Sequence, residues 1–290
     1  ASAFSARATS EIASILGNPA KYPVIATNMD NVQINVLDLN TSINSNGFRT
    51  GLEDWNGNVA PKAMIDHMKT NVDPRLRYVF EPGISAAGVY TGLDQLANAD
   101  VQTPAIAAGK LAMYNRTTLS RNQFFPGVVM NAAEVSFMAA ESYVKAGNTA
   151  AAKTAYEKGI RESISYYVAI RALSKDATSP AVTAVAPAEI TAYLAANGIS
   201  FDRATTPAAR IDLIAAQKWL HMNVVQPVEL WAEVRRLDPA LSFQADGANA
   251  QTKPPVRWSY PVSETIYNKA NYAAVSAKDN LNQKLFWDVK

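Results

Sequence analysis

The sequence predicts a mainly α-helical protein in which helices packed as hairpins carry an irregular, loop-rich part. Three observations lead to this prediction. Residues 130–146 and 149–172 have helical patterns separated only by a Gly-Asn pair. Two further helical patterns, over 207–225 and 227–236, each open on a proline, which suits the first turn of a helix. The stretches between these patterns are rich in glycine, proline and asparagine, which are typical of turns and loops.

The first two helical patterns predict a closely packed antiparallel hairpin. Apolar side chains recur at helical spacing on the first helix, at Ala133, Phe137, Ala140 and Val144. We expect Gly147 to end this helix, because glycine adopts a positive φ at little cost, and Thr149 to cap the next one. Small residues recur where the helices must approach closely, at Ala140, Ala152 and Gly159. This spacing is typical of a tetratricopeptide-like hairpin, and a single copy needs neighbouring elements to bury its faces.

We expect the 290 residues to form one domain with three parts. These parts are a loop-rich region over 17–128, a helical region over 129–237 and an irregular tail over 238–290 with little regular structure. Shorter elements are expected as follows: a helix over 3–16, one or two strands within 22–39, an exposed loop over 41–57, a helix over 61–68, a loop over 174–187 and a helix over 187–197.

The composition narrows the classes of function. Charged residues make up 18% of the chain, below the roughly 25% of average soluble domains, and the net charge of +2 gives no sign of a nucleic-acid partner. Without cysteine there are no disulfides, thiolate metal sites or cysteine nucleophiles within this chain. Two histidines are too few for a histidine-based metal cluster, so neither a metal nor a cofactor is expected. No apolar run approaches the roughly 18 residues of a membrane-spanning helix.

The candidate ligand-binding residues lie in predicted loops. Trp55 stands in a Gly/Asn-rich stretch beside Glu53 and Asp54, and an exposed tryptophan can stack on the face of a sugar. Tyr90, in a glycine-punctuated loop, is a second aromatic candidate. The two carboxylates could act as acid and base or bind calcium, but adjacent residues rarely face the same way and the spacing of a calcium loop is absent. A solvated loop is therefore the alternative for Glu53 and Asp54.

Packing explains the other conspicuous side chains. Core packing or anchoring is expected for the remaining tryptophans, Trp219, Trp231, Trp258 and, at the end of the chain, Trp287. Arg235 and Arg236 end a helix, where they can bind terminal carbonyls and pair with nearby acids. Asp66 and His67 are expected to lie at the surface, because no serine-nucleophile motif accompanies them. With no phosphate loop or dinucleotide fingerprint either, no catalytic residue is expected.

A set of motifs in a fixed order resembles the C-terminal portion of the SusD/RagB family. In chain order the motifs are Asp73-Pro74-Arg75-Leu76, Tyr90-Thr91-Gly92, Ala133-Glu134-Val135 with Ala140-Glu141 and Gly147, Gln217-Lys218-Trp219, Trp231-Ala232-Glu233 with Arg235-Arg236 and Pro239, Arg257 with Tyr260-Pro261, Glu264 and Asn268, and Leu285-Phe286-Trp287-Asp288. Together they cover nearly the whole chain, and the ordered set is more specific than any one motif.

The resemblance implies a surface-exposed lipoprotein of a Gram-negative outer membrane. Such proteins bind nutrients, often glycans, without catalysis, and form a lid over a SusC-like TonB-dependent transporter. The family is built on tetratricopeptide-like hairpins, with the ligand site in an irregular, loop-rich part. Its members are usually longer, and this chain begins Ala-Ser-Ala with no signal peptide. We therefore expect a part of a longer protein, with the lipidated cysteine and the first helical repeats on the missing N-terminal part.

Two alternatives to this function stay open. A helical-repeat scaffold could bind a protein partner and no small ligand. A glycan hydrolase would need two carboxylates placed about a scissile bond, and no such pair is evident. Within the leading hypothesis, the sequence does not distinguish a glycan from a peptide as the nutrient, because loops that bind ligands vary freely.

Overall fold

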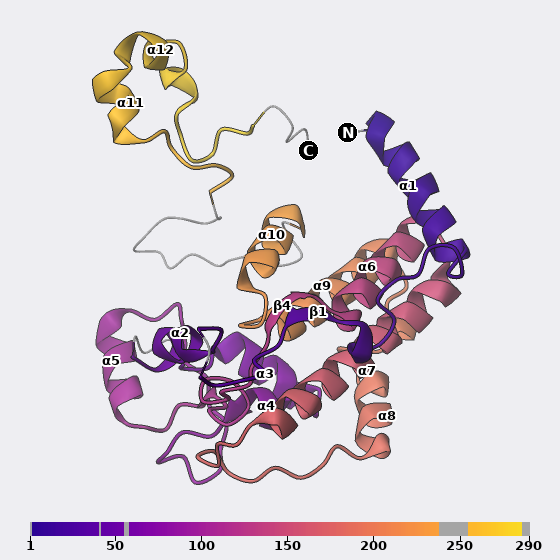
Figure 1. Ribbon diagram of the computed structural model, residues 1–290, viewed down its shortest axis with the longest axis vertical. Helices are drawn as coiled ribbons and strands as arrows, with labels where there is room; N and C mark the ends of the chain where they lie inside the picture. Colours follow the sequence, from indigo (N-terminus) through magenta and orange to yellow (C-terminus); the bar gives the residue numbers. More distant parts are fainter. Residues whose placement is uncertain (1, 41, 55–57, 238–254, 286–290) are drawn as a thin grey trace.

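The structure is a computed structural model of the 290-residue chain, and it describes every residue except 1, 41, 55–57, 238–254 and 286–290. Helices dominate it, as the sequence predicts, and irregular segments fill one side of the molecule (Figure 1). The longer helices are α1 (Ser2–Gly17), α3 (Lys62–Thr70), α5 (Ala99–Ala107), α6 (Ala132–Lys145), α7 (Thr149–Leu173), α8 (Pro187–Ala195), α9 (Pro207–Met222) and α10 (Pro227–Leu237). None of the described helices combines the length and the apolar character needed to cross a bilayer.

The turn between α6 and α7 is set by two local features. Gly147, directly after the C-cap residue Ala146, has a φ of 75°, and its amide donates to the Val144 carbonyl at 3.0 Å. The next amide, of Asn148, reaches back to the Tyr143 carbonyl at 2.9 Å, which completes a Schellman motif. The Asn148 side chain then caps α7 by accepting from the Ala151 amide at 3.1 Å. Gly147 thus ends α6 as predicted, whereas the cap of α7 lies one residue before the predicted Thr149.

The hairpin packs as closely as its small residues allow. A Cβ atom added at Gly159 would lie 2.5 Å from Cε1 of Phe137, so the ring occupies the space that a larger side chain would need. Ala140 and Ala152 are fully buried in the same core. Helix α9 packs against both α6 and α7 and supplies Ile214 to that core. The predicted close approach of the two helices is therefore present.

Two short antiparallel sheets join segments that are far apart in the sequence. Strand β1 (Val32–Ile34) pairs with β4 (Gly127–Met130), which leads directly into α6. Strand β2 (Phe80–Glu81) pairs with β3 (Met113–Tyr114), and the rings of Phe80 and Tyr114 lie 4.9 Å apart. The second sheet belongs to a core that also contains side chains from α3 and the C-terminal half of α7. This core underlies the loop-rich part of the molecule.

A buried polar network connects the loop-rich part to the helices. The Arg75 and Asp73 side chains are fully buried and form an ion pair, with 2.6 Å between Nη2 and Oδ2. The same guanidinium donates to Ser163 of α7, Tyr193 of α8 and Gln217 of α9, each at 2.8 Å. One arginine therefore links three helices to the segment between α3 and α4.

Two predictions about irregular segments are wrong in part. The predicted exposed loop over 41–57 contains α2 (Asn46–Arg49) and a π-helical turn over Thr50–Asp54, and Leu52 within it is buried. The predicted tail contains α11 (Val262–Tyr267) and α12 (Lys269–Ala273), which lie together apart from the helical hairpins (Figure 1). Such short helices carry little periodicity, so the sequence pattern does not reveal them. The remaining short segments are α4 (Leu76–Val79) and the 3₁₀ turns Asn28–Asp30, Phe201–Arg203 and Ser276–Lys278.

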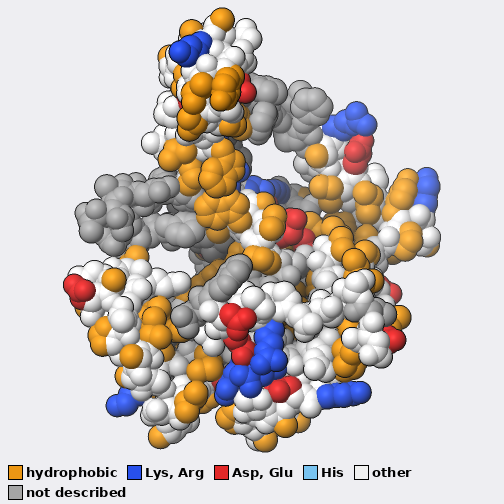
Figure 2. Space-filling model, turned by 60° about the vertical axis from the view of Figure 1, so that its left-hand side comes forward, with side chains coloured by type: hydrophobic (Ala, Val, Ile, Leu, Met, Phe, Trp, Pro, Cys, Tyr) orange, Lys and Arg blue, Asp and Glu red, His pale blue; other side chains and the backbone are white. Residues whose placement is uncertain are grey.

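The tryptophans pack less than predicted. Trp219 contacts the core beneath the loop-rich part, as expected, whereas Trp231 is 40% exposed and Trp258 is 83% exposed. Helix α10 is held through Glu233, which lies about 200° around the helix axis from Trp231. Trp258 follows Arg257, whose side chain packs on the Tyr260 ring and binds the Lys278 carbonyl. Hydrophobic side chains consequently lie at the surface of the α11–α12 unit, at the top of Figure 2. Trp287 lies outside the described residues.

At the end of α10, Arg236 pairs with nearby acids as predicted, whereas Arg235 binds a carbonyl outside the helix. Arg236 binds Glu141 of α6 through two hydrogen bonds, of 2.5 and 2.6 Å, and Glu233 through two more. Lys218 of α9 joins the same cluster, 3.0 Å from Glu233. Burial acts to raise the pKa of Glu141, but hydrogen bonds from Arg236 and Lys145 outweigh it and hold that pKa at about 2. The cluster fixes α10 against α6 and α9, and Arg235 donates to the Val256 carbonyl beyond it.

Candidate functional site

A pocket of about 220 Å³ opens in the loop-rich part, and Tyr90, one of the predicted ligand-binding residues, lines it. We call it the Tyr90 pocket. Its lining consists of Arg77, Phe80, Glu81, Pro82, Gly88, Tyr90, Asn115, Pro180, Ala181, Val182 and Thr183. These residues come from α4, from both sides of the second sheet and from the segment between α7 and α8, so the fold assembles the pocket from distant parts of the chain.

Tyr90 presents an aromatic ring and an open hydroxyl. The ring is half-buried and packs against the core beneath the loop-rich part. Lys69 donates to the Tyr90 carbonyl at 3.0 Å, which holds the backbone in place. Burial, and secondarily the negative charge of Glu81, raises the pKa of the Tyr90 hydroxyl. The group is therefore a neutral donor and acceptor at physiological pH, and no described side chain takes up its hydrogen bonds.

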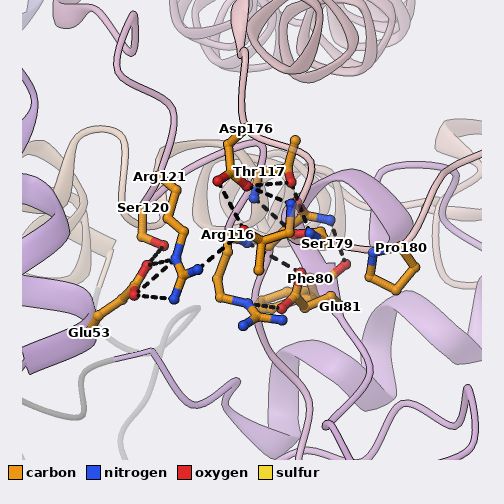
Figure 3. Close-up of polar contacts among 12 residues, drawn as sticks. Glu53, Phe80, Glu81, Arg116, Thr117, Ser120, Arg121, Asp176, Ser179 and Pro180 are labelled. Carbon is orange, nitrogen blue, oxygen red and sulfur yellow. Dashed lines mark hydrogen bonds and ion pairs between the residues drawn. The ribbon is translucent and has the colours of Figure 1, made fainter.

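One wall of the pocket is a segment that we call the strap, residues 174–186 between α7 and α8. Near its start, Ser179 and Thr117 bind each other reciprocally: the Thr117 amide donates to Ser179 Oγ at 2.8 Å, and the Ser179 amide donates to Thr117 Oγ1 at 3.0 Å (Figure 3). The Thr117 hydroxyl also donates to Asp176 at 3.0 Å. Arg171 donates to the Pro180 carbonyl at 2.9 Å. Four hydrogen bonds thus fix the strap at the edge of the pocket.

The far end of the strap is fixed as well. Arg77 Nε donates to the Thr183 carbonyl at 3.0 Å, and Nη2 donates to the Ala184 carbonyl at 3.2 Å. The Tyr78 hydroxyl donates to the same Thr183 carbonyl at 3.2 Å. The pocket-lining residues 180–183 therefore lie between two anchored points, and the wall is formed before any ligand arrives.

The two charged side chains that line the pocket are both paired. Arg77 binds the Glu189 carboxylate of α8 through two hydrogen bonds of 2.9 and 3.0 Å. Glu81 is 1% exposed, and its carboxylate binds Arg116 at 2.5 Å (Figure 3). Arg77 in turn holds the pKa of Glu189 below its usual value. Each charge is therefore neutralised by a partner within the protein.

Glu53, a predicted ligand-binding residue, is bound by partners within the protein. Its carboxylate is bound by Arg121 at 2.9 to 3.1 Å and by the Ser120 hydroxyl at 2.6 Å (Figure 3). Burial acts to raise the pKa of Glu53, but the hydrogen bonds from Arg121 and Ser120 outweigh it and hold that pKa low. The alternative of a solvated loop is wrong for Glu53, because this carboxylate fastens the π-helical turn to the segment after β3. Asp54 is exposed, and Trp55 lies outside the described residues.

Neither histidine belongs to a reactive cluster. His221 is fully buried, with Nδ1 3.0 Å from Ser163 and Nε2 2.9 Å from Asn131, and burial lowers its pKa to about 3. His67 is half-buried, with its ring edge-on to Trp219, while the neighbouring Asp66 is exposed and binds Lys62. In the part of the chain that the structure describes, no three His, Asp or Glu side chains come together as metal ligands.

Sequence reasoning found one pocket residue and missed the others. Tyr90 was found because it is an aromatic residue in a glycine-rich loop. Arg77, Asn115 and the strap carry no local signal, because their proximity to Tyr90 arises only when the second sheet and α7 pack together. The strap itself was predicted only as a loop.

Comparisons with known proteins agree with the fold. A SusD homologue from Bacteroides fragilis aligns over 96% of this chain and 61% of its own, with a TM-score of 0.72 and 24% identity. A second B. fragilis SusD homologue aligns over 97% and 61%, with a TM-score of 0.75 and 22% identity. A chitin-binding protein aligns over 97% and 61%, with a TM-score of 0.65 and 19% identity. No curated protein matches the sequence.

These structures define the class: a SusD-like helical scaffold with a loop-rich part. The family model described as "starch-binding associating with outer membrane", SusD-like, matches residues 1–261, and the chain belongs to that family. This confirms the family suggested by the sequence motifs. The chain spans about three-fifths of the length of the solved relatives, since the alignments cover 61% of each of them.

Proposed function

We propose that this chain is the nutrient-capturing part of a cell-surface binding protein, and that it holds an oligosaccharide in the Tyr90 pocket. The family description names starch binding and the outer membrane, and one structural relative is a chitin-binding protein. The observation that carries the proposal is a half-buried aromatic ring with an open hydroxyl, lining a pocket with an anchored wall. An aromatic face suits the C–H surface of a sugar ring, and the hydroxyl suits a sugar hydroxyl.

Capture of this kind needs no covalent step. The pocket contributes stacking and hydrogen bonds, and its two charged lining residues are bound to partners within the protein. We propose that the bound nutrient passes to a SusC-like TonB-dependent transporter in the outer membrane. A lipid anchor would then belong to a part of the protein outside these 290 residues. Purified protein is expected to bind a glycan and to leave it chemically unchanged.

A calorimetric screen against malto-oligosaccharides and chito-oligosaccharides tests the proposal. We expect saturable binding to at least one of them, and at least tenfold weaker binding in Tyr90→Ala, since tenfold corresponds to about 1.4 kcal/mol of lost contact. Tyr90→Phe, which keeps the ring, should retain most of the affinity. Tyr22→Ala, which removes another surface tyrosine, is the control. Binding that is indifferent to Tyr90→Ala would show that the site lies elsewhere.

One observation favours a second function, a scaffold for a protein partner. Apolar side chains flank β1 at the surface, with Met29 93% and Leu37 88% exposed. Within β1 itself Val32 and Ile34 are also exposed, at 51% and 56%, and a run of exposed apolar side chains can mark a protein contact. Failure of every glycan in the screen, together with recovery of a transporter bound to the protein and loss of that complex in Leu37→Asp, would favour the scaffold.

A further inference from the structure

We propose that the Tyr90 pocket recognises a single uncharged sugar unit at the end of a glycan, and that it rejects units carrying a carboxylate or a sulfate. The inference rests on the proposed function and adds the chemical class of the ligand. Three features of the pocket carry it: its size, the pairing of its charges and the neutral groups that remain available.

The size of the pocket limits how much of a glycan can enter. Pockets that enclose drug-sized ligands have volumes of about 300 to 1,000 Å³. The Tyr90 pocket, at about 220 Å³, lies below that range and has room for one sugar ring. The strap closes one side, because residues 180–183 are anchored at both ends. With one wall anchored and room for about one ring, the pocket suits the terminal unit of a chain, and in the proposed mode the other units stay in solvent.

The charges that line the pocket are already neutralised. Both oxygens of Glu189 bind Arg77, whose Nε and Nη2 also donate to strap carbonyls. Glu81 is bound by Arg116. An anion that enters such a pocket leaves water without gaining a counter-ion, which is costly. A carboxylate on the sugar would also lie close to the buried Glu81 carboxylate, and like charges repel.

The other nearby cations do not change this conclusion. Arg171 is not among the lining residues. It donates to Asn115 and to the Pro180 carbonyl, and although its charge acts on Tyr90, the charges of Glu81 and Asp176 act on it in turn. Lys69 is exposed to water and reaches only the Tyr90 backbone, outside the lining. Water and salt screen such an exposed charge.

The lining groups that remain available to contact a ligand are uncharged. The Tyr90 hydroxyl can both donate and accept, and its ring offers a face for stacking. Pro82, Pro180 and Val182 add apolar surface around it. An uncharged pyranose presents apolar C–H faces and hydroxyl groups at its rim, so its chemistry matches these groups.

Three forms of one ligand separate charge from size. The oligosaccharide that binds in the calorimetric screen is compared with two derivatives of its terminal unit. In the uronamide the hydroxymethyl group is replaced by a carboxamide, and in the uronate it is replaced by a carboxylate. The amide and the acid have nearly the same size. We expect the uronamide to bind within about threefold of the parent and the uronate at least tenfold more weakly. Di- to hexasaccharides of the same sugar should bind within about threefold of one another.

A single substitution should change this preference. Glu189→Gln removes the carboxylate that neutralises Arg77, so the guanidinium becomes available to an anionic ligand. The ratio of uronate to uronamide affinity should rise at least fivefold in Glu189→Gln. Asp202→Asn is the matched control, because it removes an exposed carboxylate paired with Lys153, away from the pocket lining, and should leave the ratio unchanged.

The failures of the two proposals are distinguishable. Tyr90-dependent binding in which the uronate equals the uronamide, or in which affinity climbs with every added unit up to the hexasaccharide, would overturn this inference and leave the proposed function intact. An unchanged ratio in Glu189→Gln would contradict the charge argument. If no glycan binds in a Tyr90-dependent manner, the proposed function fails and this inference fails with it.

Discussion

Arg75 is a charged side chain that the fold removes completely from water. Burial alone would lower its pKa, but the Asp73 carboxylate outweighs that effect and raises it, so the guanidinium stays charged. Six hydrogen bonds from its side chain to Asp73, Ser163, Tyr193 and Gln217 satisfy it. The residue therefore joins the loop-rich part to three helices, and each nitrogen of its guanidinium has an acceptor.

Arg75→Met is expected to destabilise the protein by about 3 to 5 kcal/mol, because it leaves the buried Asp73 carboxylate without its partner. Urea unfolding followed by circular dichroism measures the loss. Arg7→Met serves as the control, since Arg7 forms an exposed pair with Glu11 that is worth less than about 1 kcal/mol. Equal effects of the two substitutions would contradict the role assigned to Arg75.

His221 makes stability depend on pH. Burial lowers its pKa from the usual 6.5 to about 3, so the folded protein keeps it neutral while the unfolded chain takes up a proton below about pH 6.5. Stability should therefore fall as the pH drops from 6.5 to 5, by up to about 1.4 kcal/mol per pH unit for this group.

Removal of the imidazole tests this assignment. In His221→Gln the slope of the unfolding free energy against pH between 6.5 and 5 should be smaller, by about the 1.4 kcal/mol per pH unit that corresponds to one proton. This holds whatever the absolute stability of the variant. His67→Gln is the comparison, because His67 is only half-buried and its pKa is lowered less. An undiminished slope in His221→Gln would show that other groups cause the pH dependence.

Among the helices, the packing of α6 on α7 depends on one glycine. Gly159→Ala places a Cβ atom 2.5 Å from the Phe137 ring, so the helices must separate or the ring must move. We expect a loss of about 1 to 3 kcal/mol from overpacking, measured as a lower urea midpoint. Gly47→Ala, in a short exposed helix with nothing within 4 Å of the added atom, should be neutral or slightly stabilising. A neutral Gly159→Ala would mean that the hairpin is looser than described.

The strap depends on the reciprocal bonds between Ser179 and Thr117. Ser179→Ala leaves the buried Thr117 amide without its acceptor, which costs about 1 to 3 kcal/mol locally. Amide hydrogen exchange over residues 180–184 should accelerate, and glycan affinity should fall about three- to tenfold because the wall is no longer preformed. Ser276→Ala, on an exposed turn, is the control and should change neither. Unchanged exchange in Ser179→Ala would show that the other anchors suffice.

Local patterns predicted the elements that depend on local forces. The hairpin, the turn at Gly147 and the close approach at Gly159 all follow from residues within 30 positions of one another, and the structure contains each of them. The pairing of Glu53 with Arg121 was not predicted, because the two residues lie 68 positions apart and sequence spacing gives no indication of it. The strap was missed as a pocket wall for the same reason, since its contact with Thr117 spans 62 residues. Side chains that meet only in the folded state lie beyond a single sequence.

At the scale of the whole molecule, the helical scaffold and the candidate site belong to different parts of the structure. Helices α6, α7 and α9 form one core, and the loop-rich part forms a second core around the two-stranded sheet of β2 and β3. The Arg75 network joins the two cores, and Tyr90, which lines the pocket, packs against the second. This arrangement lets the loops that form the pocket vary while the scaffold that identifies the family is kept.

The central claim, that the Tyr90 pocket is the glycan site, is tested most directly by a crystal structure of the protein with the oligosaccharide from the calorimetric screen. The account predicts electron density for one terminal sugar ring against the Tyr90 side chain, between it and residues 180–183 of the strap, with the remaining units in solvent. A glycan bound at another surface with this pocket unoccupied would contradict it.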